Sequence, residues 1–343
     1  MRFILQGIVI VGLGTLVRLP AAMVHAPVAV ADETGPARVG EAPEPSAPTP
    51  PRTEAVVLVV LDGARWQEVL VGTDNRFATG EDRGVNADAL MPSLHHMIRE
   101  GAAVGAPDRG YPMTATGPNF ISLPGYNEIF SGKTPFECAD NDCAPTREPT
   151  IVDQVGSGSS DVAVFSSWGP IVRAAATKAS DVVMSTGTPG TGEFRADRAT
   201  ADRALAYFAE RHPTFMFVGL GEPDEYAHKG DYPGYLGSLR QADVVIGELL
   251  SLLATGGDRG QRTTVLVTCD HGRADDFRNH GAPWPESSRV WLVAYGGAIT
   301  AHGFIDAERR HRLADIVPTI RELLGLPADL TSGAGSPIAE LLR

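Results

Sequence analysis

Two short segments of the sequence place acids and imidazoles close together. The run LVTCDHGRAD (266–275) ends an apolar stretch in Asp270 and His271, and GEPDEYAHKGD places Asp224 four residues before His228. Carboxylate and imidazole are both ligands that suit zinc and related divalent ions. The two segments together therefore indicate a metal site.

Two further side chains extend this set to three aspartates and three histidines. Asp62 ends an early apolar run, and His280 follows in NHGAPW. Taken singly, an aspartate after a strand more often caps a helix, and one histidine is usually structural. However, several carboxylates can lie this close together only if cations neutralise their charge. The combination predicts a divalent metal centre.

The elements that must position these residues follow from the apolar pattern. Continuous apolar runs are typical of strands buried on both faces of a parallel sheet, and helical patterns lie between them. The runs are EAVVLVVLDG, DVAVFSS, TFMFVGLG, TTVLVTCD and RVWLVAYG; the helical patterns are PSLHHMIREG, ATADRALAYFAERH, YLGSLRQADVVIGELLSLLATG and LADIVPTIRELLG. This alternation predicts an α/β fold with a mostly parallel central sheet sandwiched between helices. Ligands bind outside the carboxyl ends of such strands, so the acids should converge on one crevice.

The N-terminal region has the pattern of an exported protein. A small basic start, an apolar stretch from Phe3 to Val17 and a small-residue cleavage site predict a signal peptide over 1–31. Residues 32–54 are rich in Pro, Ala and acids and predict a linker, so the catalytic domain should span 55–343. The apolar stretch is shorter than the roughly 20 residues that span a bilayer. We expect a periplasmic or secreted protein without stable membrane insertion after cleavage, with a retained anchor as the alternative.

Composition limits the classes of partner. Lys and Arg number 29 against 42 acids in 343 residues, a net charge of −13, which argues against a nucleic-acid-binding or anionic-membrane surface. An anionic substrate must therefore be attracted by a local feature of its binding site and not by the net charge of the chain. In an exported chain Cys138 and Cys143 could close a disulfide, whereas Cys269 is interpreted as a buried core residue.

These segments, in this order, resemble the alkaline phosphatase superfamily, and within it the nucleotide pyrophosphatase/phosphodiesterase-like branch. The resemblance covers most of the chain after the linker. Its segments are VVLDGARW, PSLHHMIREG, ISLPGYNEIFSGKTP, GEPDEYAHKGD, TCDHGRAD with NHGAPW, and DIVPTIRELLGLP. The chain is short for this superfamily, so no large cap domain is expected.

The resemblance implies two Zn²⁺ ions, although other divalent cations could serve, and a serine nucleophile. One ion would be held by Asp224, His228 and His280, and the other by Asp62, Asp270, His271 and the hydroxyl of Ser122. Coordination lowers the pKa of a hydroxyl and can replace a histidine base. The other ion would bind a phosphoryl oxygen and the hydrolytic water. Ser131 and Thr116 are the competing nucleophiles.

The sequence also departs from the family pattern. After Pro124 the phosphodiesterase branch commonly has Asn then His, where this chain has Gly125 and Tyr126. An amide elsewhere would have to contact the phosphoryl group, and Asn119, Asn127 and Asn141 all remain candidates. Tyr126 also stands where sulfatases have Arg, which disfavours sulfate esters.

Several other polar residues are interpreted as having no part in the chemistry. Arg65 and Lys133 could assist but are expected to be solvated surface charges, and His95 and His96 are expected to be structural. The Asp-Ser-Ala signature of bacterial alkaline phosphatases is not identified, which argues against an efficient general phosphomonoesterase.

We therefore expect an exported two-zinc hydrolase of a small phosphate ester, with phosphodiesters or pyrophosphates preferred to monoesters and a covalent phosphoserine intermediate. Two alternatives remain open at this point. One is a phosphotransferase that uses an alcohol acceptor at the same site, and the other is a non-catalytic secreted metal-binding protein.

Overall fold

The computed structural model describes residues 52–135, 137–158, 161–177, 182–187, 194–300 and 302–342, all within the compact unit Ala47–Arg343. The expected signal peptide and residues 32–51 of the expected linker lie outside the described residues. Residues 52 and 53 donate backbone hydrogen bonds to the carbonyl of Leu323, and Glu54 donates one to that of Arg262. These last linker residues are therefore held against the folded unit.

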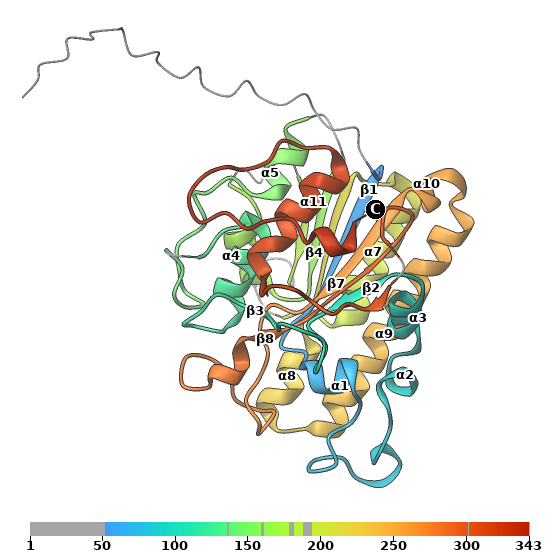
Figure 1. Cartoon of the computed structure of the whole chain (residues 1–343), viewed down its shortest axis with the longest axis vertical. Helices are drawn as coiled ribbons and strands as arrows, with labels where there is room; N and C mark the ends of the chain where they lie inside the picture. Colours follow the sequence, from blue (N-terminus) through green and yellow to red (C-terminus); the bar gives the residue numbers. More distant parts are fainter. Residues whose placement is uncertain are drawn as a thin grey trace, which may run out of the picture. The chain divides into compact units, whose positions relative to one another are not determined.

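A single eight-stranded sheet forms the centre of this unit (Figure 1). Its strands are β1 (Ala55–Leu61), β2 (Ala102–Val104), β4 (Val162–Ser166), β5 (Val183–Thr186), β6 (Phe215–Leu220), β7 (Thr263–Thr268), β9 (Leu292–Tyr295) and β10 (Gly303–Phe304). They lie in the order β10-β2-β9-β7-β1-β6-β4-β5, and among these strands β9 alone runs antiparallel to its neighbours. The expected mostly parallel sheet is confirmed.

The three central strands are buried along their whole length. Every residue of β1, β6 and β7 is buried, and each large apolar side chain in such a position stabilises the fold by about 1.5–3 kcal/mol. The register pairs Leu61 with Leu220 and Val60 with Thr268. The carboxyl ends of these three strands therefore lie side by side at one edge of the sheet.

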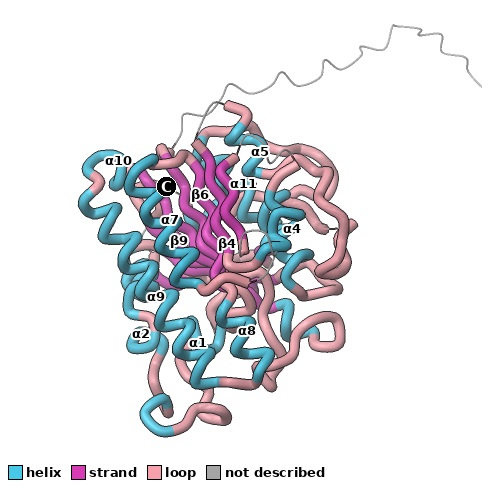
Figure 2. Tube along the Cα trace, turned by 180° about the vertical axis from the view of Figure 1, so that it is seen from behind, coloured by secondary structure: helices cyan, strands magenta, loops and turns pink. Residues whose placement is uncertain are grey.

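Helices cover both faces of the sheet (Figures 1 and 2). They are α1 (Trp66–Leu70), α2 (Ala87–Leu90), α3 (Pro92–Glu100), α4 (Ser122–Ser131), α5 (Ile151–Gly156), α6 (Val172–Ala175), α7 (Asp197–Arg211), α8 (Glu222–Lys229), α9 (Tyr232–Thr255), α10 (Gly257–Gln261) and α11 (Ile316–Leu324). Helices α3, α7, α8 and α10 pack on α9, whereas α5, α6 and α11 pack on α4. The expected sandwich is confirmed. No helix among the described residues is both long and apolar enough to cross a membrane.

The last apolar run differs from its expected form. RVWLVAYG was expected as one strand, but it divides at Trp291 into β8 (Arg289–Val290) and β9. β8 joins a small second sheet with β3 (Met113–Thr114) and β11 (His311–Arg312). The Trp291 side chain is fully buried and its Nε1 donates to the carbonyl of Ala64 at 3.0 Å. This buried hydrogen bond accounts for the break, because the chain departs from strand geometry at Trp291 and the indole can then reach the Ala64 carbonyl.

Candidate metal centre

Three aspartates meet at the edge where β1, β6 and β7 end. Asp62 follows β1 directly, and its N–H donates to the carbonyl of Leu220 on β6 at 2.9 Å. Asp270 lies two residues beyond β7, and its Oδ1 accepts from the Gly63 N–H at 3.0 Å. Asp224 lies in the first turn of α8, which begins two residues after β6. Strand adjacency therefore brings together acids that lie up to 208 positions apart in the chain.

A first group of potential ligands consists of Asp224, His228 and His280. Their ligand atoms all lie within 4.8 Å of one another. The four-residue spacing on α8 places His228 Nε2 3.0 Å from Asp224 Oδ2, and His280 Nε2 lies 3.0 Å from His228 Nε2. The Nδ1 of His280 is 3.0 Å from the carbonyl of Phe120. A proton on Nδ1 satisfies that contact and leaves the Nε2 lone pair directed at the group.

A second group consists of Asp62, Asp224 and His271, again with ligand atoms within 4.8 Å. His271 has its Nδ1 2.9 Å from the carbonyl of Gly272, which leaves Nε2 free to act as a ligand. That Nε2 lies 3.5 Å from Asp62 Oδ1 and 3.9 Å from Asp224 Oδ1. Asp224 thus contributes to both groups.

Asp270, which the family resemblance assigned to the second ion, lies beside this second group. Its Oδ2 is 3.5 Å from His271 Nε2. The same oxygen is buried and has no hydrogen-bond partner among the described residues. A buried carboxylate oxygen without a donor is costly unless it faces a cation. Asp270 therefore fits a metal ligand in this position.

The electrostatics of the centre lead to the same interpretation. Burial raises the pKa of Asp62 to about 6, and burial together with the neighbouring Asp62 charge raises the pKa of Asp270. Burial lowers the pKa of His271 to about 4 and strongly lowers that of His280. The imidazoles of His271 and His280 are therefore neutral, and the acids lack sufficient counter-charge. A divalent cation would supply that charge and would need neutral imidazole ligands. The donor set fits such an ion.

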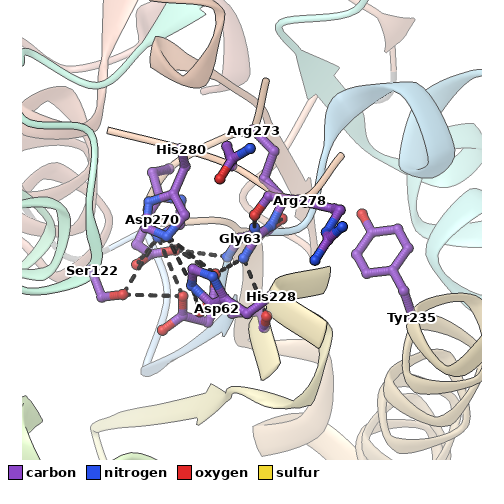
Figure 3. A network of polar contacts seen from close by, with 12 residues as sticks. Asp62, Gly63, Ser122, His228, Tyr235, Asp270, Arg273, Arg278 and His280 are labelled. Carbon is purple, nitrogen blue, oxygen red and sulfur yellow. Dashed lines mark hydrogen bonds and ion pairs between the residues drawn. The ribbon is translucent and has the colours of Figure 1, made fainter. Parts of the chain in front are cut away.

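Ser122 places a hydroxyl directly against these ligands (Figure 3). Its Oγ lies 3.4 Å from Asp62 Oδ1 and 3.4 Å from His271 Nε2, in a buried position.

The two competing hydroxyls, those of Thr116 and Ser131, form hydrogen bonds elsewhere. Thr116 Oγ1 donates to Glu128 at 2.5 Å, and Ser131 Oγ donates to the carbonyl of Asn127 at 2.6 Å. Among these three hydroxyls, only that of Ser122 contacts the acid and imidazole cluster.

The start of α4 leaves one amide free beside this hydroxyl. Ile121, at the N-cap, provides no side-chain hydrogen bond. The Leu123 N–H donates to Asn141 Oδ1 at 2.8 Å, and the Gly125 N–H donates to the Ile121 carbonyl at 3.1 Å. Residue 124 is a proline and has no N–H. The Ser122 N–H is left without an acceptor among the described residues, at the positive end of a helix.

The three candidate amides have different positions. Asn127 donates to the carbonyl of Leu123 within α4, and Asn119 donates to the carbonyl of Ala139. Asn141 is the one whose carboxamide contacts the amide next to Ser122. Its Nδ2 has no acceptor among the described residues, so it remains available to a ligand at the start of α4.

Two residues noted only as departures from the family pattern contribute to the centre. The hydroxyl of Tyr126 donates to Asp62 Oδ2 at 2.9 Å, and the ring is buried. A Cβ on Gly125 would overlap the carbonyl oxygen of Asp270, so glycine allows α4 to approach the end of β7. Tyr126 lies four residues after Ser122, a spacing that puts both on one helix face. That spacing was the available signal for its role.

Arg273 was passed over in the sequence although it directly follows Asp270-His271-Gly272. Its guanidinium is buried, forms an ion pair with Asp224 Oδ1, and donates from Nε to the carbonyl of Gly63 at 3.2 Å. An arginine here holds one oxygen of Asp224 and partly balances the acids. No local pattern distinguishes such a buried arginine from an exposed one.

The expectation that Arg65 is a solvated surface charge is wrong. Its side chain is completely buried and paired with Glu68, and its Nη2 lies 3.5 Å from Asp74 Oδ2. Lys133 is partly buried, with Nζ 2.7 Å from Glu148 and 3.6 Å from Asp329. Neither Arg65 nor Lys133 pairs with the metal-ligand candidates.

The expected structural role of His95 agrees with its contacts, since its Nε2 lies 2.9 Å from the carbonyl of Val69.

Comparison with known sequences gives one family match and a set of partial relatives. The profile of the Metalloenzyme superfamily matches residues 173–328. The 2,3-bisphosphoglycerate-independent phosphoglycerate mutase of Rippkaea orientalis is 31% identical over 121 residues, which is 33% of this chain and 22% of that protein. The mutase of Gloeobacter violaceus is 29% identical over 140 residues, 38% of this chain and 25% of that protein. The matches thus span about a quarter of the length of these relatives.

Solved structures share the fold over most of the chain. Murine ectonucleotide pyrophosphatase/phosphodiesterase 5 in complex with AMP has a TM-score of 0.60 and 13% identity, covering 84% of this chain and 100% of that one. The phosphonate monoester hydrolase of Agrobacterium radiobacter has a TM-score of 0.60 and 13% identity, covering 84% and 77%. A 2-O GAG sulfatase has a TM-score of 0.59 and 14% identity, covering 85% and 74%. At such identities the likeness concerns the fold alone.

Proposed function

Because the Metalloenzyme superfamily profile matches residues 173–328 and the chain shares its fold with a phosphodiesterase and a phosphonate hydrolase, we propose that it is a member of the alkaline phosphatase superfamily, an exported, metal-dependent hydrolase of phosphate esters that uses Ser122 as its nucleophile. Diesters or pyrophosphates are the proposed substrates. One observation carries the proposal: the Ser122 hydroxyl lies 3.4 Å from both Asp62 and His271, at the edge where the two ligand groups meet and Asp270 lies beside them.

The side chains of this edge would hold two divalent ions, and zinc is the proposed metal because imidazole and carboxylate both suit it. Asp224, His228 and His280 would hold one ion, and Asp62, Asp270 and His271 the other, with Asp224 between them. When bound, such ions lower the pKa of a hydroxyl and neutralise the charge of a phosphate ester. This local charge explains how a chain of net charge −13 could attract an anion.

The residues of the chain would perform the remaining steps. Ser122 Oγ forms a bond to phosphorus while the bond to the leaving alcohol breaks, and water later cleaves the phosphoserine ester. The free Ser122 N–H and Asn141 Nδ2 are the proposed donors to a phosphoryl oxygen, because both lie at the start of α4. Donors placed in advance at developing negative charge contribute about 10²–10³-fold in rate each.

One feature supports phosphate esters over sulfate esters. The fifth position of the Ser122 segment is Tyr126, whose hydroxyl is engaged with Asp62, so no guanidinium stands there to bind a sulfate.

Export is supported by the Cys138–Cys143 disulfide, since disulfides persist mainly outside the cytosol.

The test is a comparison of esters with the purified, metal-loaded chain. Bis-p-nitrophenyl phosphate should be hydrolysed faster than p-nitrophenyl phosphate, a phenylphosphonate ester or p-nitrophenyl sulfate, and EDTA should abolish turnover. Ser122→Ala should keep the metal content and lose nearly all turnover. Ser131→Ala, on the same helix, is the matched control and should remain active.

Three results would contradict the proposed nucleophile, the proposed hydrolysis or catalysis itself. Turnover by Ser122→Ala at the wild-type rate would exclude this serine. Turnover only after addition of alcohol acceptors would instead identify a phosphotransferase. Two bound metal equivalents without turnover of any ester would favour a non-catalytic metal-binding protein.

A further inference from the structure

The loop closed by the disulfide lies against the start of the nucleophile helix. Cys138 and Cys143 are bonded, with their Cα atoms 5.2 Å apart, and residues 138–143 are called the disulfide loop. Asn141, within this loop, accepts the hydrogen bond of the Leu123 N–H at 2.8 Å. Asn119, three residues before Ser122, donates to the carbonyl of Ala139 at 2.8 Å. The loop therefore contacts the chain on both sides of the nucleophile.

These contacts replace a cap that α4 lacks. The N-cap residue Ile121 has no side chain that can accept a hydrogen bond, although the first turn of a helix has unsatisfied N–H groups. Asn141 provides the missing acceptor from a distant part of the sequence. It also leaves the Ser122 N–H as the single free donor of that turn, beside the attacking hydroxyl.

Packing does little to hold Asn141 in this position. The residue is exposed, and outside the disulfide the loop is tied by the hydrogen bonds of Asn119 and Leu123 and by the weak contacts of Arg173. Arg173 donates to the Asn141 carbonyl at 3.3 Å and lies 3.8 Å from Asp142, whose side chain is 99% exposed. Exposed ion pairs of this kind contribute little to stability. The bond between Cys138 and Cys143 is the covalent constraint on the loop, and a reductant can remove it.

We propose that the Cys138–Cys143 disulfide is a positioning element that holds Asn141 against the start of α4, so that hydrolysis at Ser122 depends on the redox state of the loop. The effect on turnover rests on the proposed function. The chemistry is a two-electron reduction that breaks the S–S bond and gives two thiols. A phosphine becomes its oxide and takes the oxygen and the two thiol protons from one water, whereas a dithiol supplies both protons and closes to its own disulfide. The remaining cysteine, Cys269, is fully buried and free, so it should not respond.

The experiment treats the metal-loaded protein with tris(2-carboxyethyl)phosphine, because a dithiol could also remove metal. Reduction should lower kcat for bis-p-nitrophenyl phosphate about 10-fold or more, since small misplacements of catalytic groups cost up to about 10²-fold in rate. The metal content should stay constant. Independently of turnover, amide hydrogen exchange in residues 119–127 should become faster.

Three variants distinguish the loss of the disulfide from the loss of the Asn141 contact. Cys138→Ser with Cys143→Ser should resemble the reduced protein and show no response to the phosphine. Asn141→Ala should also be slow, with little further loss on reduction. Asp142→Ala leaves the disulfide and Asn141 in place, so this matched control should keep both the wild-type rate and the response to reduction.

Full activity and unchanged exchange after complete reduction, verified by titration of two thiols, would overturn the proposal. If the oxidised, metal-loaded chain hydrolyses no ester, the proposed function fails instead, and the exchange measurement still tests the contact between loop and helix. If the double cysteine variant does not fold, reduction of the native protein provides the same test.

Discussion

The hydroxyl of Tyr126 donates a 2.9 Å hydrogen bond to Asp62 Oδ2, although the two residues are 64 positions apart. Both side chains are buried. The bond occupies one oxygen of Asp62 and leaves the other, Oδ1, 3.4 Å from Ser122 Oγ and 3.5 Å from His271 Nε2. It therefore joins the nucleophile helix to the end of β1 and orients a potential metal ligand.

Tyr126→Phe should weaken metal binding about 10-fold, because partners that orient a ligand contribute about 10–100-fold to affinity. The free energy of unfolding should fall by about 1 kcal/mol through the lost hydrogen bond. Metal titration and urea unfolding measure both quantities. Tyr207→Phe removes a tyrosine–aspartate bond distant from the centre, to Asp161, and should keep metal affinity. Equal affinities in the two variants would exclude this role for Tyr126.

Gly125→Ala should destabilise the protein by about 1–3 kcal/mol and reduce metal content, because the added methyl overlaps the Asp270 carbonyl. Gly237→Ala is the matched control, since its Cβ would meet nothing within 4 Å in the interior of α9. That change should stabilise by up to about 1 kcal/mol. Thermal unfolding with metal analysis would reveal the contrast, and a neutral Gly125→Ala would show that α4 can move away from β7.

Asp224→Ala should remove more metal than His228→Ala. Asp224 belongs to both ligand groups, whereas His228 belongs to the first only. Elemental analysis after dialysis should show about one equivalent lost from His228→Ala and more than one from Asp224→Ala. The same stoichiometry in both variants would contradict the shared position of Asp224. His96→Ala, which alters a residue of α3 outside both groups, should bind metal normally.

The stability of the protein should decrease as pH rises from about 4 to about 7, in part through Asp197. Burial raises the pKa of Asp197 to about 7, from an ordinary value of 3.8. Over this interval the folded state retains a proton that the unfolded state has lost, so folding is favoured below the interval and the benefit disappears as pH approaches 7. The contribution is about 1–4 kcal/mol.

Asp197 also accepts the N–H groups of Gly221 and Glu222 at 2.8 and 2.9 Å, at the start of α8. Asp197→Asn should therefore flatten the decrease in urea-unfolding free energy between pH 4.5 and 7. Asp202→Asn alters an exposed acid on the same helix and should leave the slope unchanged. Identical slopes for Asp197→Asn and the wild type would exclude Asp197 as the titrating group.

Much of the fold could be predicted because the central strands are continuous apolar runs. Asp62 and Asp270 follow these strands within two residues, and the parallel register of β1 with β6 and β7 requires the strand ends to meet. Short strands were not predictable. β3, β8 and β11 have two residues each, too few for any periodicity, and their pairing depends on distant parts of the chain.

The sequence by itself determined the α/β sandwich and the set of side chains that could bind metal, because both depend on local patterns of apolar and ligand residues. The tertiary structure alone decided that Asp224 lies between two ligand groups, that Tyr126 contacts Asp62, that Arg65 is buried, and which of three amides lies beside Ser122. These relationships are distances between segments far apart in the chain. Such distances depend on how the helices pack on the sheet, which the local pattern of one segment does not contain.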